Sequence, residues 1–433
     1  MKTLTHYLLV SAAVLAPTTV FAQDTVRYWM WDGQQAPVYQ QCANDFEAMN
    51  SDIHIEITQT GWDQYWTNLT TSFISGDAPD VFVNHLMRLP EFAANQMIED
   101  LTPLLAKASY DTSGYLPGLL ENWSKDGAVY GLPKDWATVA VAYDRDKLKA
   151  AGLAPSDLAD MTWNPENGGS FQKIIAHLTV DTNGKRGDEE GFDPNSVATF
   201  GLVLNPLSPQ GETEWAYLAA STGWRFIDEP WSTHYNFDDP RLAKSLTWIR
   251  DLARVHHLMP TVEQTGRLGA ETLMFSDKGA MTVTGSWLVG LYHQSKPSVA
   301  FAPIPAGPEG RKTMFNGLAD SIWTGSPVKD AAWKWVQYLG SDACQATVAK
   351  AGVVFPAQQD QIETTVKAFE EKGVDVSAFT KVATSETTFA PPITDYGNEI
   401  SSIVKAALEK VMLGQQKPEE ILTNANEEVN SLF

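Results

Sequence analysis

The segment Asp126–Asp144 gathers side chains of the types that bind small ligands. Within it, Lys134, Asp135 and Trp136 place a cation, a carboxylate and a flat aromatic ring next to one another. The segment begins with an Asp-Gly turn signal, and its residues 136–143 alternate as a half-buried strand does. A turn that opens into such a strand suits the mouth of a ligand cleft. Taken alone, the pattern fits an ordinary edge hairpin equally well.

Known catalytic motifs are missing from the sequence. It has no His-Glu-x-x-His, no Gly-x-Ser-x-Gly, no phosphate-binding loop and no dinucleotide fingerprint. A glycosidase needs only two carboxylates without a fixed spacing, so a secreted glycosidase stays open as an alternative. We predict a protein that binds a ligand, performs no chemistry on it and uses no cofactor.

The loop that begins at Asp181 resembles a calcium loop only in part. Asp181 and Asn183 fit the first and third positions of an EF-hand, but Arg186 stands where glycine is required and Phe192 where the bidentate glutamate belongs. A solvated turn is favoured over a calcium site for residues 181–190. We predict no metal site.

The elements expected near the amino terminus alternate in the order of a parallel sheet. They are strands at residues 25–32, 53–57 and 81–83 and helices at 37–49 and 63–75. Strand, helix, strand, helix, strand is the arrangement of a sheet covered on both faces. Ligands bind outside the carboxyl ends of such strands, which here are Trp31-Asp32 and Asn84-His85.

The rest of the chain is less regular. Residues 145–260 suggest helices separated by long loops, with one helix at 248–255. Further strands are expected at 279–284, 299–303 and 321–323, and further helices at 329–340, 341–351, 397–413 and 418–431. No internal repeat is visible.

Length and charge narrow the class of protein. A chain of 433 residues exceeds what one core usually holds, so two domains are expected. The formal net charge is −22. Such acidity argues against a nucleic-acid partner and against docking on anionic lipid, and it says little about a small neutral ligand.

The first 22 residues have the pattern of a secretory signal. A short positive start is followed by the apolar run Tyr7–Ala16 and by the small-x-Ala cleavage pattern Val20-Phe21-Ala22. We expect cleavage after Ala22. Residue 23 is Gln and not Cys, so lipid attachment is not expected, and the mature protein is predicted to be exported and soluble.

Cys42 and Cys344 are the two cysteines of the chain, and in an oxidising compartment they are disulfide candidates. Cys42 shares an apolar helical stripe with Val38, Phe46 and Met49. Two separate buried thiols are the alternative. A bond is favoured.

Ordered motifs along the chain resemble those of a known family. They are the opening strand with its Asp-Gly ending, residues 46–57 and 65–69, Ser75-Gly76-Asp77-Ala78-Pro79-Asp80-Val81-Phe82, Gly131-Leu132-Pro133-Lys134-Asp135, Tyr143-Asp144, Gly279-Ala280-Met281, Gly285-Ser286-Trp287, Asn316-Gly317 and the helix from Ser341. Each motif is weak alone, but together they resemble the extracellular solute-binding proteins of ABC sugar importers, the group that includes maltose-binding protein.

The resemblance implies an α/β fold of two lobes, the type II periplasmic-binding-protein fold, with a ligand cleft between the lobes and hinge crossings. It implies an amino-terminal lobe of residues 23–137 and 317–360 and a carboxyl-terminal lobe of 138–316 and 361–433. It further implies a periplasmic monomer that binds a neutral sugar, of di- or oligosaccharide size, by cleft closure and delivers it to the permease subunits of an ABC transporter.

Sugar sites combine aromatic surfaces for ring faces with planar polar groups for hydroxyls. The resemblance assigns the ligand to Trp31, Asp32, Gln34, Asn84, His85, Arg88, Asp135, Trp136, Gln210, Glu212, Trp215, Trp287, Asn316, Asp320 and Tyr396. Trp287 and Asp32 are the first candidates. For any tryptophan at a domain seam the alternative is a core residue, and for His85 it is a structural role.

Two positions depart from the maltose-binding relatives. Met87 replaces an acid and Ala137 replaces a glutamate, so maltodextrin specificity is not expected. A polyol or sugar-phosphate receptor is the second alternative, although a phosphate would require an arginine cluster and Arg88 is the one arginine among the candidates.

Overall fold

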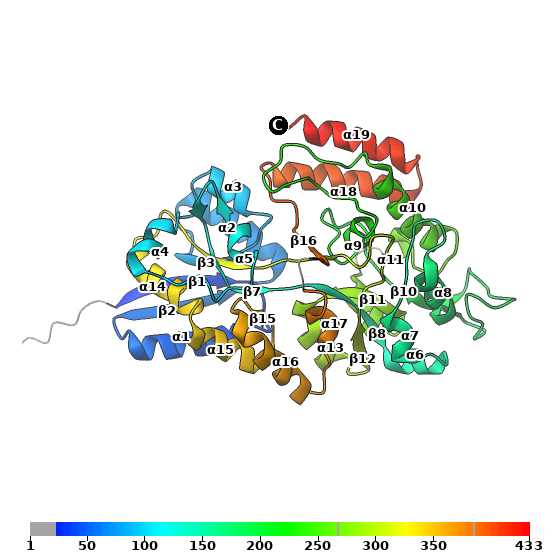
Figure 1. Ribbon diagram of the computed structural model, residues 1–433, viewed down its shortest axis with the longest axis horizontal. Coiled ribbons are helices and arrows are strands. Elements are labelled where there is room, and N and C mark those ends of the chain that lie inside the picture. Colours follow the sequence, from blue (N-terminus) through cyan, green and yellow to red (C-terminus); the bar gives the residue numbers. More distant parts are fainter. Residues whose placement is uncertain (1–22, 266–267, 384–385) are drawn as a thin grey trace, which may run out of the picture.

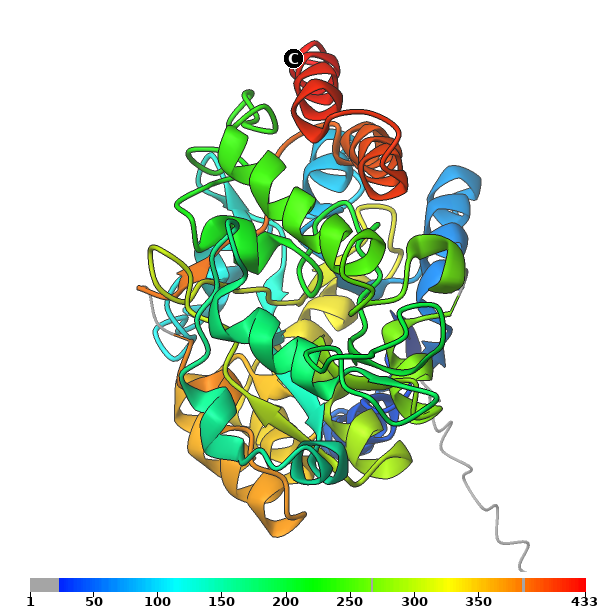
Figure 2. The same cartoon turned by 90° about the vertical axis from the view of Figure 1, so that its right-hand side faces the viewer.

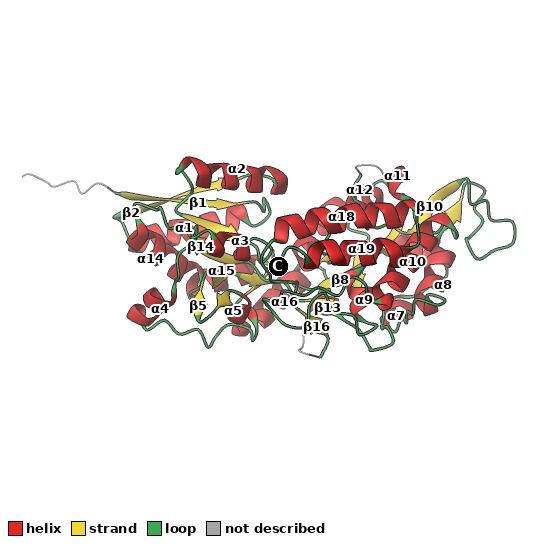
Figure 3. Cartoon of the chain, turned by 90° about the horizontal axis from the view of Figure 1, so that it is seen from above, coloured by secondary structure: helices red, strands yellow, loops and turns green. Residues whose placement is uncertain are grey.

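The computed structural model describes residues 23–265, 268–383 and 386–433, and the predicted signal segment 1–22 lies outside them. The described chain forms two lobes, each built around its own five-stranded sheet with helices on its faces (Figure 1). The view from above shows the lobes side by side, joined by segments that run between them (Figure 3). The expected two-lobed α/β fold is confirmed.

The sheet of the first lobe has the strand order β2-β1-β3-β14-β6. Its elements in chain order are β1 (Asp24–Met30), α1 (Ala36–Met49), β2 (Ile53–Gln59), α2 (Trp62–Ser75), β3 (Val81–Asn84), β6 (Leu132–Pro133) and β14 (Ala319–Ile322). β1 lies parallel to both β2 and β3, which confirms the predicted arrangement. β14 enters from the far end of the sequence and runs antiparallel to β3 and β6.

Local sequence explains these elements. In β2, Ile53 and Ile55 are buried while His54 and Glu56 are exposed, as the pleat of a strand requires. α2 ends because Gly76 adopts a φ of 71°, the left-handed conformation that closes a helix and that glycine accepts without strain.

The sheet of the second lobe has the order β12-β8-β11-β10-β9. Its strands are β8 (Val139–Asp144), β9 (Val180–Asp181), β10 (Val197–Leu202), β11 (Gly279–Gly285) and β12 (Val299–Ala302). β9 and β10 lie in the region where the sequence suggested only helices and loops.

The prediction that the strand after Trp136 is half-buried is wrong. All six residues of β8 are buried, because β11 and β12 flank the strand and other elements cover both its faces. Val139 and Val141 belong to the large core of the second lobe, whereas Ala140 packs in the cluster between the lobes. The alternation of valine and alanine therefore reflects two packed faces and not one packed and one solvated face.

The remaining elements surround the sheets. Those before residue 240 are α3 (Leu89–Ala94), α4 (Thr102–Ala108), α5 (Leu119–Asn122), β4 (Ser124–Lys125), β5 (Ala128–Val129), β7 (Asp135–Trp136), α6 (Arg145–Ala150), α7 (Pro155–Ala159), α8 (Gly169–Leu178) and α9 (Ala216–Ala220). Those that follow are α10 (Pro240–Arg254), α11 (Val262–Thr265), α12 (Ala270–Phe275), η1 (Ser286–Leu288), α13 (Val289–Ser295), β13 (Thr313–Met314), α14 (Lys329–Leu339), α15 (Asp342–Ala351), β15 (Phe355–Pro356), η2 (Gln359–Gln361), α16 (Ile362–Glu371), α17 (Ser377–Thr380), β16 (Thr388–Phe389), α18 (Gly397–Leu413) and α19 (Pro418–Asn430). Figure 2 shows α18 and α19, in orange and red, together at one end of the second lobe, where they contact each other and α10.

The chain passes between the lobes near Ala137. β7 pairs with β15, and β8 begins in the other sheet only two residues after β7 ends. Here the N–H of Ala137 donates to the carbonyl of Asn316 at 2.8 Å, and the N–H of Asn316 donates back at 3.1 Å. Two crossing segments therefore hold each other at the hinge. α16, which the predicted boundaries assign to the second lobe, packs against α15 of the first. The exact lobe boundaries therefore stay a prediction.

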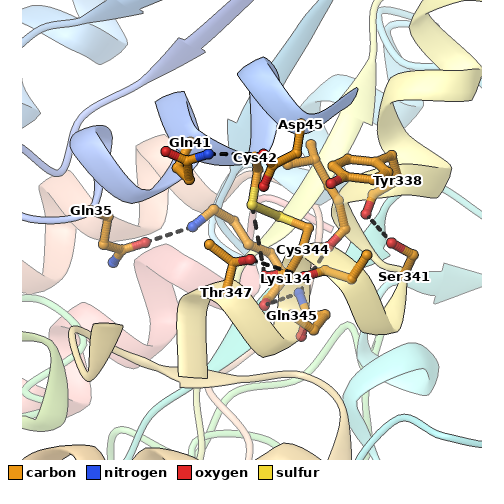
Figure 4. The surroundings of a disulfide bond; sticks show 12 residues. Gln35, Gln41, Cys42, Asp45, Lys134, Tyr338, Ser341, Cys344, Gln345 and Thr347 are labelled. Atoms are coloured by element: carbon orange, nitrogen blue, oxygen red, sulfur yellow. Dashed lines mark hydrogen bonds between the residues drawn. A yellow bond between two sulfur atoms is a disulfide. The ribbon is translucent and has the colours of Figure 1, made fainter. Parts of the chain in front are cut away.

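Cys42 of α1 and Cys344 of α15 form a disulfide (Figure 4). The favoured pairing is confirmed, and both residues lie in the core of the first lobe. Figure 4 also shows Lys134 beside the bond, with its side chain directed at Gln35. Met49, expected on the same buried stripe, is 65% exposed because it ends α1 beyond the packed part of the helix.

The loop after β9 is organised by hydrogen bonds from its backbone to the side chain of Asp181. The carboxylate of Asp181 accepts the N–H groups of Asn183, Lys185 and Asp193 at 2.8 to 2.9 Å. Within the described part of the chain, no cluster of three or more histidine, cysteine or acidic side chains could hold a metal ion. None of the described helices is both long and apolar enough to cross a membrane.

Candidate ligand-binding site

A cavity of about 410 Å³ lies between the lobes. From the first lobe it is lined by residues after β1, at the start of α2, after β3, in β7 and beside β15, and from the second lobe by the loop after β10 and by η1. The lining residues are Trp31, Asp32, Gln35, Trp62, His85, Met87, Asp135, Ala137, Ser208, Pro209, Gln210, Glu212, Thr213, Glu214, Trp287, Asn316, Gly317, Leu318 and Val354. The carboxyl ends of the first-lobe strands thus open on the cavity, as parallel sheets require.

Aromatic rings reach the cavity from both lobes. Trp31 and Trp62 meet edge to face in the first lobe, with ring centroids 5.0 Å apart and planes at 87°. Trp287 enters from the second lobe. A β-carbon at position 285 would come within 2.1 Å of the Trp287 ring. The ring can therefore adopt this position only because residue 285 is glycine. Together these rings offer flat apolar surfaces on two sides.

Asp32 is oriented by the start of α1. Its carboxylate accepts the N–H of Gln34 at 2.8 Å, the N–H of Gln35 at 3.2 Å and the side-chain amide of Gln35 at 2.9 Å. The other end of the Gln35 side chain accepts a hydrogen bond from Nζ of Lys134 at 2.6 Å. The carboxylate is therefore fixed before a ligand arrives.

Asp135 is almost completely buried, and its two oxygens have different partners. Oδ1 accepts the N–H of Leu318 at 3.1 Å, whereas Oδ2 forms an ion pair with Nζ of Lys134 at 3.5 Å and accepts no hydrogen bond from the described residues. Burial raises the pKa of Asp135, and Lys134 offsets part of that rise. A ligand hydroxyl or amine is the kind of group that would complete this oxygen.

His85 is a neutral imidazole. Burial and the nearby Arg88 guanidinium lower the pKa of His85 to about 4. Its Nδ1 accepts the N–H of Met87 at 3.2 Å, and its Nε2 lies 3.0 Å from Nδ2 of Asn316. Both His85 and Asn316 line the cavity.

Glu212 and Glu214 supply carboxylates from the second lobe. Burial and the neighbouring Glu214 raise the pKa of Glu212 to about 8, while the nearby Asn316 amide offsets part of the rise. Burial raises the pKa of Glu214 to about 7, although Thr213 donates to it at 2.8 Å. Oε1 of Glu212 is buried without a hydrogen-bond partner in the described chain.

The cavity brings together many of the residues predicted to bind ligand. They are Trp31, Asp32, His85, Asp135, Gln210, Glu212, Trp287 and Asn316. The other predicted residues do not line it. Asn84 is buried against Ser321, to which it donates at 3.1 Å, and Asp320 accepts the hydroxyl of Tyr28 at 2.7 Å.

Two further predicted tryptophans pack in cores. The ring of Trp136 stacks on Phe355 at 4.5 Å in the cluster between the lobes. Trp215 is buried in the second lobe, where its indole N–H donates to the carbonyl of Ser208 at 2.9 Å. Trp215 thus supports the loop that lines the cavity rather than lining it itself.

Three predicted residues lie outside the cavity near the meeting of the lobes. The side chain of Gln34 accepts a hydrogen bond from Gln294 of α13 at 2.9 Å. Arg88 donates to Asn398 of α18 and lies over the ring of Trp66 at 5.3 Å. Tyr396 is half-exposed and packs on Phe433.

Sequence reasoning missed Trp62 and Gln35. Trp62 follows the carboxyl end of β2, which lies at the same edge of the parallel sheet as the ends of β1 and β3. The same rule that selected Trp31 and His85 would have found it. Gln35 has no comparable signal, because its role depends on Lys134, which is far away in the sequence.

The arrangement can hold a molecule with flat apolar faces and a rim of hydrogen-bonding groups. Rings face it from both lobes, and carboxylates and amides lie between them. Such a site binds through stacking and polar contacts.

Both the sequence and the fold match known proteins. A sequence profile described as bacterial extracellular solute-binding protein matches residues 32–346. A protein of Brucella abortus (strain 2308), named as a binding protein, is 21% identical over 98% of this chain and 97% of its own length. The arabinooligosaccharide-binding protein of Bacillus subtilis (strain 168) is 25% identical over 69% of this chain and 65% of its own. The solved structure of the ABC substrate-binding protein Lmo0181 from Listeria monocytogenes in complex with cycloalternan has a TM-score of 0.82 at 20% identity, covering 95% of this chain and 99% of that one.

Proposed function

Because this chain belongs to the family of bacterial extracellular solute-binding proteins, we propose that it is the substrate-binding component of an ABC importer. It binds a sugar of di- or oligosaccharide size between its lobes and delivers it to a membrane permease. The family consists of binding proteins, so the glycosidase alternative is dropped.

The observation that carries the proposal is the cavity with tryptophans on both sides. Trp31 and Trp62 from one lobe and Trp287 from the other can cover the two faces of a sugar ring. Between them lie carboxylates and amides that can pair with hydroxyl groups. A volume of about 410 Å³ lies toward the lower end of the range for small-molecule sites, which favours a short saccharide over a long one.

The charge of the lining disfavours an anionic ligand. Asp32, Asp135, Glu212 and Glu214 line the cavity, and no lysine or arginine does so within the described residues. A sugar phosphate needs cations or helix amino termini for its phosphate oxygens. The sugar-phosphate alternative is therefore disfavoured, whereas a polyol remains a second candidate because it presents the same hydroxyl groups.

Closure of the lobes is the proposed signal to the permease. The described structure has polar contacts between the lobes on either side of the cavity. Gln294 donates to Gln34 at 2.9 Å, and Asn398 donates to Glu91 at 2.6 Å. Ligand bound to both lobes would favour the arrangement in which these contacts form.

The remaining parts of the proposal concern export and organisation. We propose cleavage after Ala22, a free Gln23 without lipid, and a periplasmic monomer. The lobes are proposed to comprise residues 23–137 with 317–360 and residues 138–316 with 361–433. Mass spectrometry of the purified mature protein tests the amino terminus, and its sedimentation tests the monomer.

A ligand panel tests the function. The mature protein is heated alone and with mono-, di- and oligosaccharides, polyols and sugar phosphates. A ligand that binds only the folded state adds about 2.7 kcal/mol of stability at one hundred times its dissociation constant. We expect a rise in melting temperature with a short saccharide that is recovered unchanged. No rise with any sugar contradicts the proposal, and a rise with polyols alone supports the second candidate.

A further inference from the structure

The charges around the cavity point to a narrower ligand class. We propose that the sugar carries a protonated amino group, so that the protein is a receptor for an amino sugar. This inference rests on the proposed function, and it replaces the neutral sugar expected from the sequence with a sugar that carries a positive charge.

The first observation is an uncompensated set of carboxylates. Asp32 and Asp135 face the cavity from the first lobe, and Glu212 and Glu214 face it from the second. Lys134 does not line the cavity; its side chain is only 1% exposed, donates to Gln35 and lies 3.5 Å from Asp135. One lysine cannot balance four carboxylates. In the site without ligand, burial makes Glu212 and Glu214 hold protons more tightly, at pKa values of about 8 and about 7. A cation placed between the carboxylates would favour their ionised forms.

The second observation is that two of these carboxylates have oxygens without hydrogen-bond partners in the described chain. They are Oδ2 of Asp135, on a residue that is only 2% exposed, and Oε1 of Glu212. Oδ2 of Asp135 lies 3.5 Å from Nζ of Lys134, whereas Glu212 is in no ion pair within the described residues. A neutral hydroxyl can donate one hydrogen bond but leaves the charge of the carboxylate in place. An ammonium group donates three hydrogen bonds and also neutralises charge, which makes its bonds to carboxylates stronger.

The third observation is the division of the carboxylates between the lobes. Closing the cleft brings Asp32 and Asp135 toward Glu212 and Glu214, and the ionised forms of these carboxylates become less favourable beside one another as water leaves. A cation bound between them removes this repulsion. The same charge that gives affinity would thereby promote closure, so an amine is a better closing signal than a hydroxyl.

The aromatic side chains are compatible with the same ligand. The faces of Trp31, Trp62 and Trp287 attract cations as well as apolar ring faces. His85 adds no opposing charge, because its imidazole is neutral. An amino sugar therefore uses both the apolar and the anionic components of the lining.

Matched sugars provide the test. Calorimetry compares the affinity for glucosamine with the affinities for glucose and N-acetylglucosamine. It makes the same comparison for the β-1,4-linked glucosamine dimer, cellobiose and N,N′-diacetylchitobiose. The three monosaccharides of galacto configuration are measured in the same way. We expect the amine to bind about tenfold more tightly than its hydroxyl and acetyl counterparts. We also expect this advantage to shrink as salt is raised.

Other outcomes of this comparison overturn the inference in distinguishable ways. If a hydroxyl or acetyl sugar binds as tightly as its amine counterpart, the protein is a sugar receptor that does not recognise an amino group. If spermidine or choline binds in preference to every sugar, the protein recognises the amine and not a sugar. No binding by any sugar in the full panel overturns both the inference and the proposed function.

Charge-removing variants separate charge from shape. Glu212→Gln and Asp135→Asn keep the size of the side chain, and each is expected to weaken binding of the amine about tenfold more than it weakens binding of the hydroxyl sugar. Asp238→Asn, which removes an exposed acid of the second lobe, is the control and is expected to change neither. Equal weakening of both sugars would assign these carboxylates to hydroxyl binding and overturn the inference. Melting curves of the variants verify that each is folded.

Discussion

Trp62 is the most exposed of the tryptophans that line the cavity, with 43% of its surface accessible. It makes edge-to-face contacts with Trp31 and Trp66 but is not part of a core cluster. A ligand that covers this ring would bury further apolar surface, because a large part of the side chain is still accessible.

Replacement of this ring tests its role. We expect Trp62→Ala to weaken sugar binding about tenfold, since stacking of a ring face contributes about 1 kcal/mol or more beyond burial. Trp62→Tyr should restore most of the affinity. Titration followed by calorimetry gives both values. A Trp62→Ala protein that binds the sugar as tightly as the unmodified one would exclude Trp62 from the site.

Asp320 illustrates a buried carboxyl whose effect concerns stability. Burial raises the pKa of Asp320 to about 7, with Asp135 adding to the rise, while Lys134 and the hydrogen bond from Tyr28 offset part of it. In the unfolded chain the pKa of an aspartate is about 4. The folded state therefore holds this proton more tightly, so the stability it confers is complete below about pH 4 and is lost as the pH rises toward 7.

This sign gives a prediction for Asp320→Asn. The unmodified protein should lose about 2 kcal/mol between pH 5 and pH 8 through this group, and the variant should not. Urea denaturation at the two pH values measures the difference. Asp135, Glu212 and Glu214 have raised pKa values too and preserve part of the decline in both proteins. An unchanged decline in the variant would contradict the assignment.

Residue type alone predicted only part of the site. Trp31 and Trp287 reach the cavity, whereas Trp136 and Trp215 lie in cores, although all four were expected to bind the ligand. Whether a tryptophan lines the cavity or packs in a core depends on which segments meet across the hinge. These segments lie far apart in the sequence, so a local pattern does not reveal their contact.

At the scale of elements, the disulfide ties α1 to α15. Its cysteines are 302 positions apart, and both helices belong to the first lobe. The bond therefore closes a long loop of the unfolded chain without joining one lobe to the other.

Its removal should affect stability and spare binding. We expect the Cys42→Ala, Cys344→Ala double variant to lose about 2–5 kcal/mol of unfolding free energy. The affinity for sugar should stay within about twofold, because neither cysteine lines the cavity. Chemical denaturation and calorimetry measure the two quantities. A large loss of affinity in a folded variant would show that the bond acts on the site.

Elements could be predicted from the sequence where their local residue pattern matches their environment in the fold. β1, β2 and β3 were found because alternation and turn residues agree with their environment, as in Ile53 and Ile55. β8 was found but its burial was not, because a strand packed on both faces can still alternate between large and small residues. β9 and β10 were missed because their pairing joins short segments across the loop after Asp181.

At the scale of the whole molecule, polar side chains of the two lobes meet at several places, one of them the ion pair of Lys125 with Asp395 at 3.7 Å. Asn398 of α18 accepts a hydrogen bond from Arg88 and donates one to Glu91 of α3. Gln294 and Gln34 make a further contact elsewhere along the same meeting of the lobes. Contacts of this kind contribute only in the arrangement that brings the lobes together.

Their loss should therefore weaken binding indirectly. We expect Asn398→Ala to lower sugar affinity about fivefold, because it removes hydrogen bonds that contribute about 1 kcal/mol to the closed arrangement. Solution scattering should show a smaller contraction at a given sugar concentration. Asn424→Ala, on the exposed side of α19, is the control. Unchanged affinity and unchanged contraction in the Asn398 variant would mean that this contact does not stabilise closure.

The position of β14 in the first sheet also determines when the molecule can fold. This strand lies between β3 and β6 but comes from residues 319–322, and the partner of Cys42 arrives only with Cys344. A growing chain therefore cannot complete its first lobe until most of it has been synthesised. An exported protein must remain unfolded while it is threaded across a membrane. Here the order of the segments itself would delay folding until nearly the whole chain has arrived on the far side.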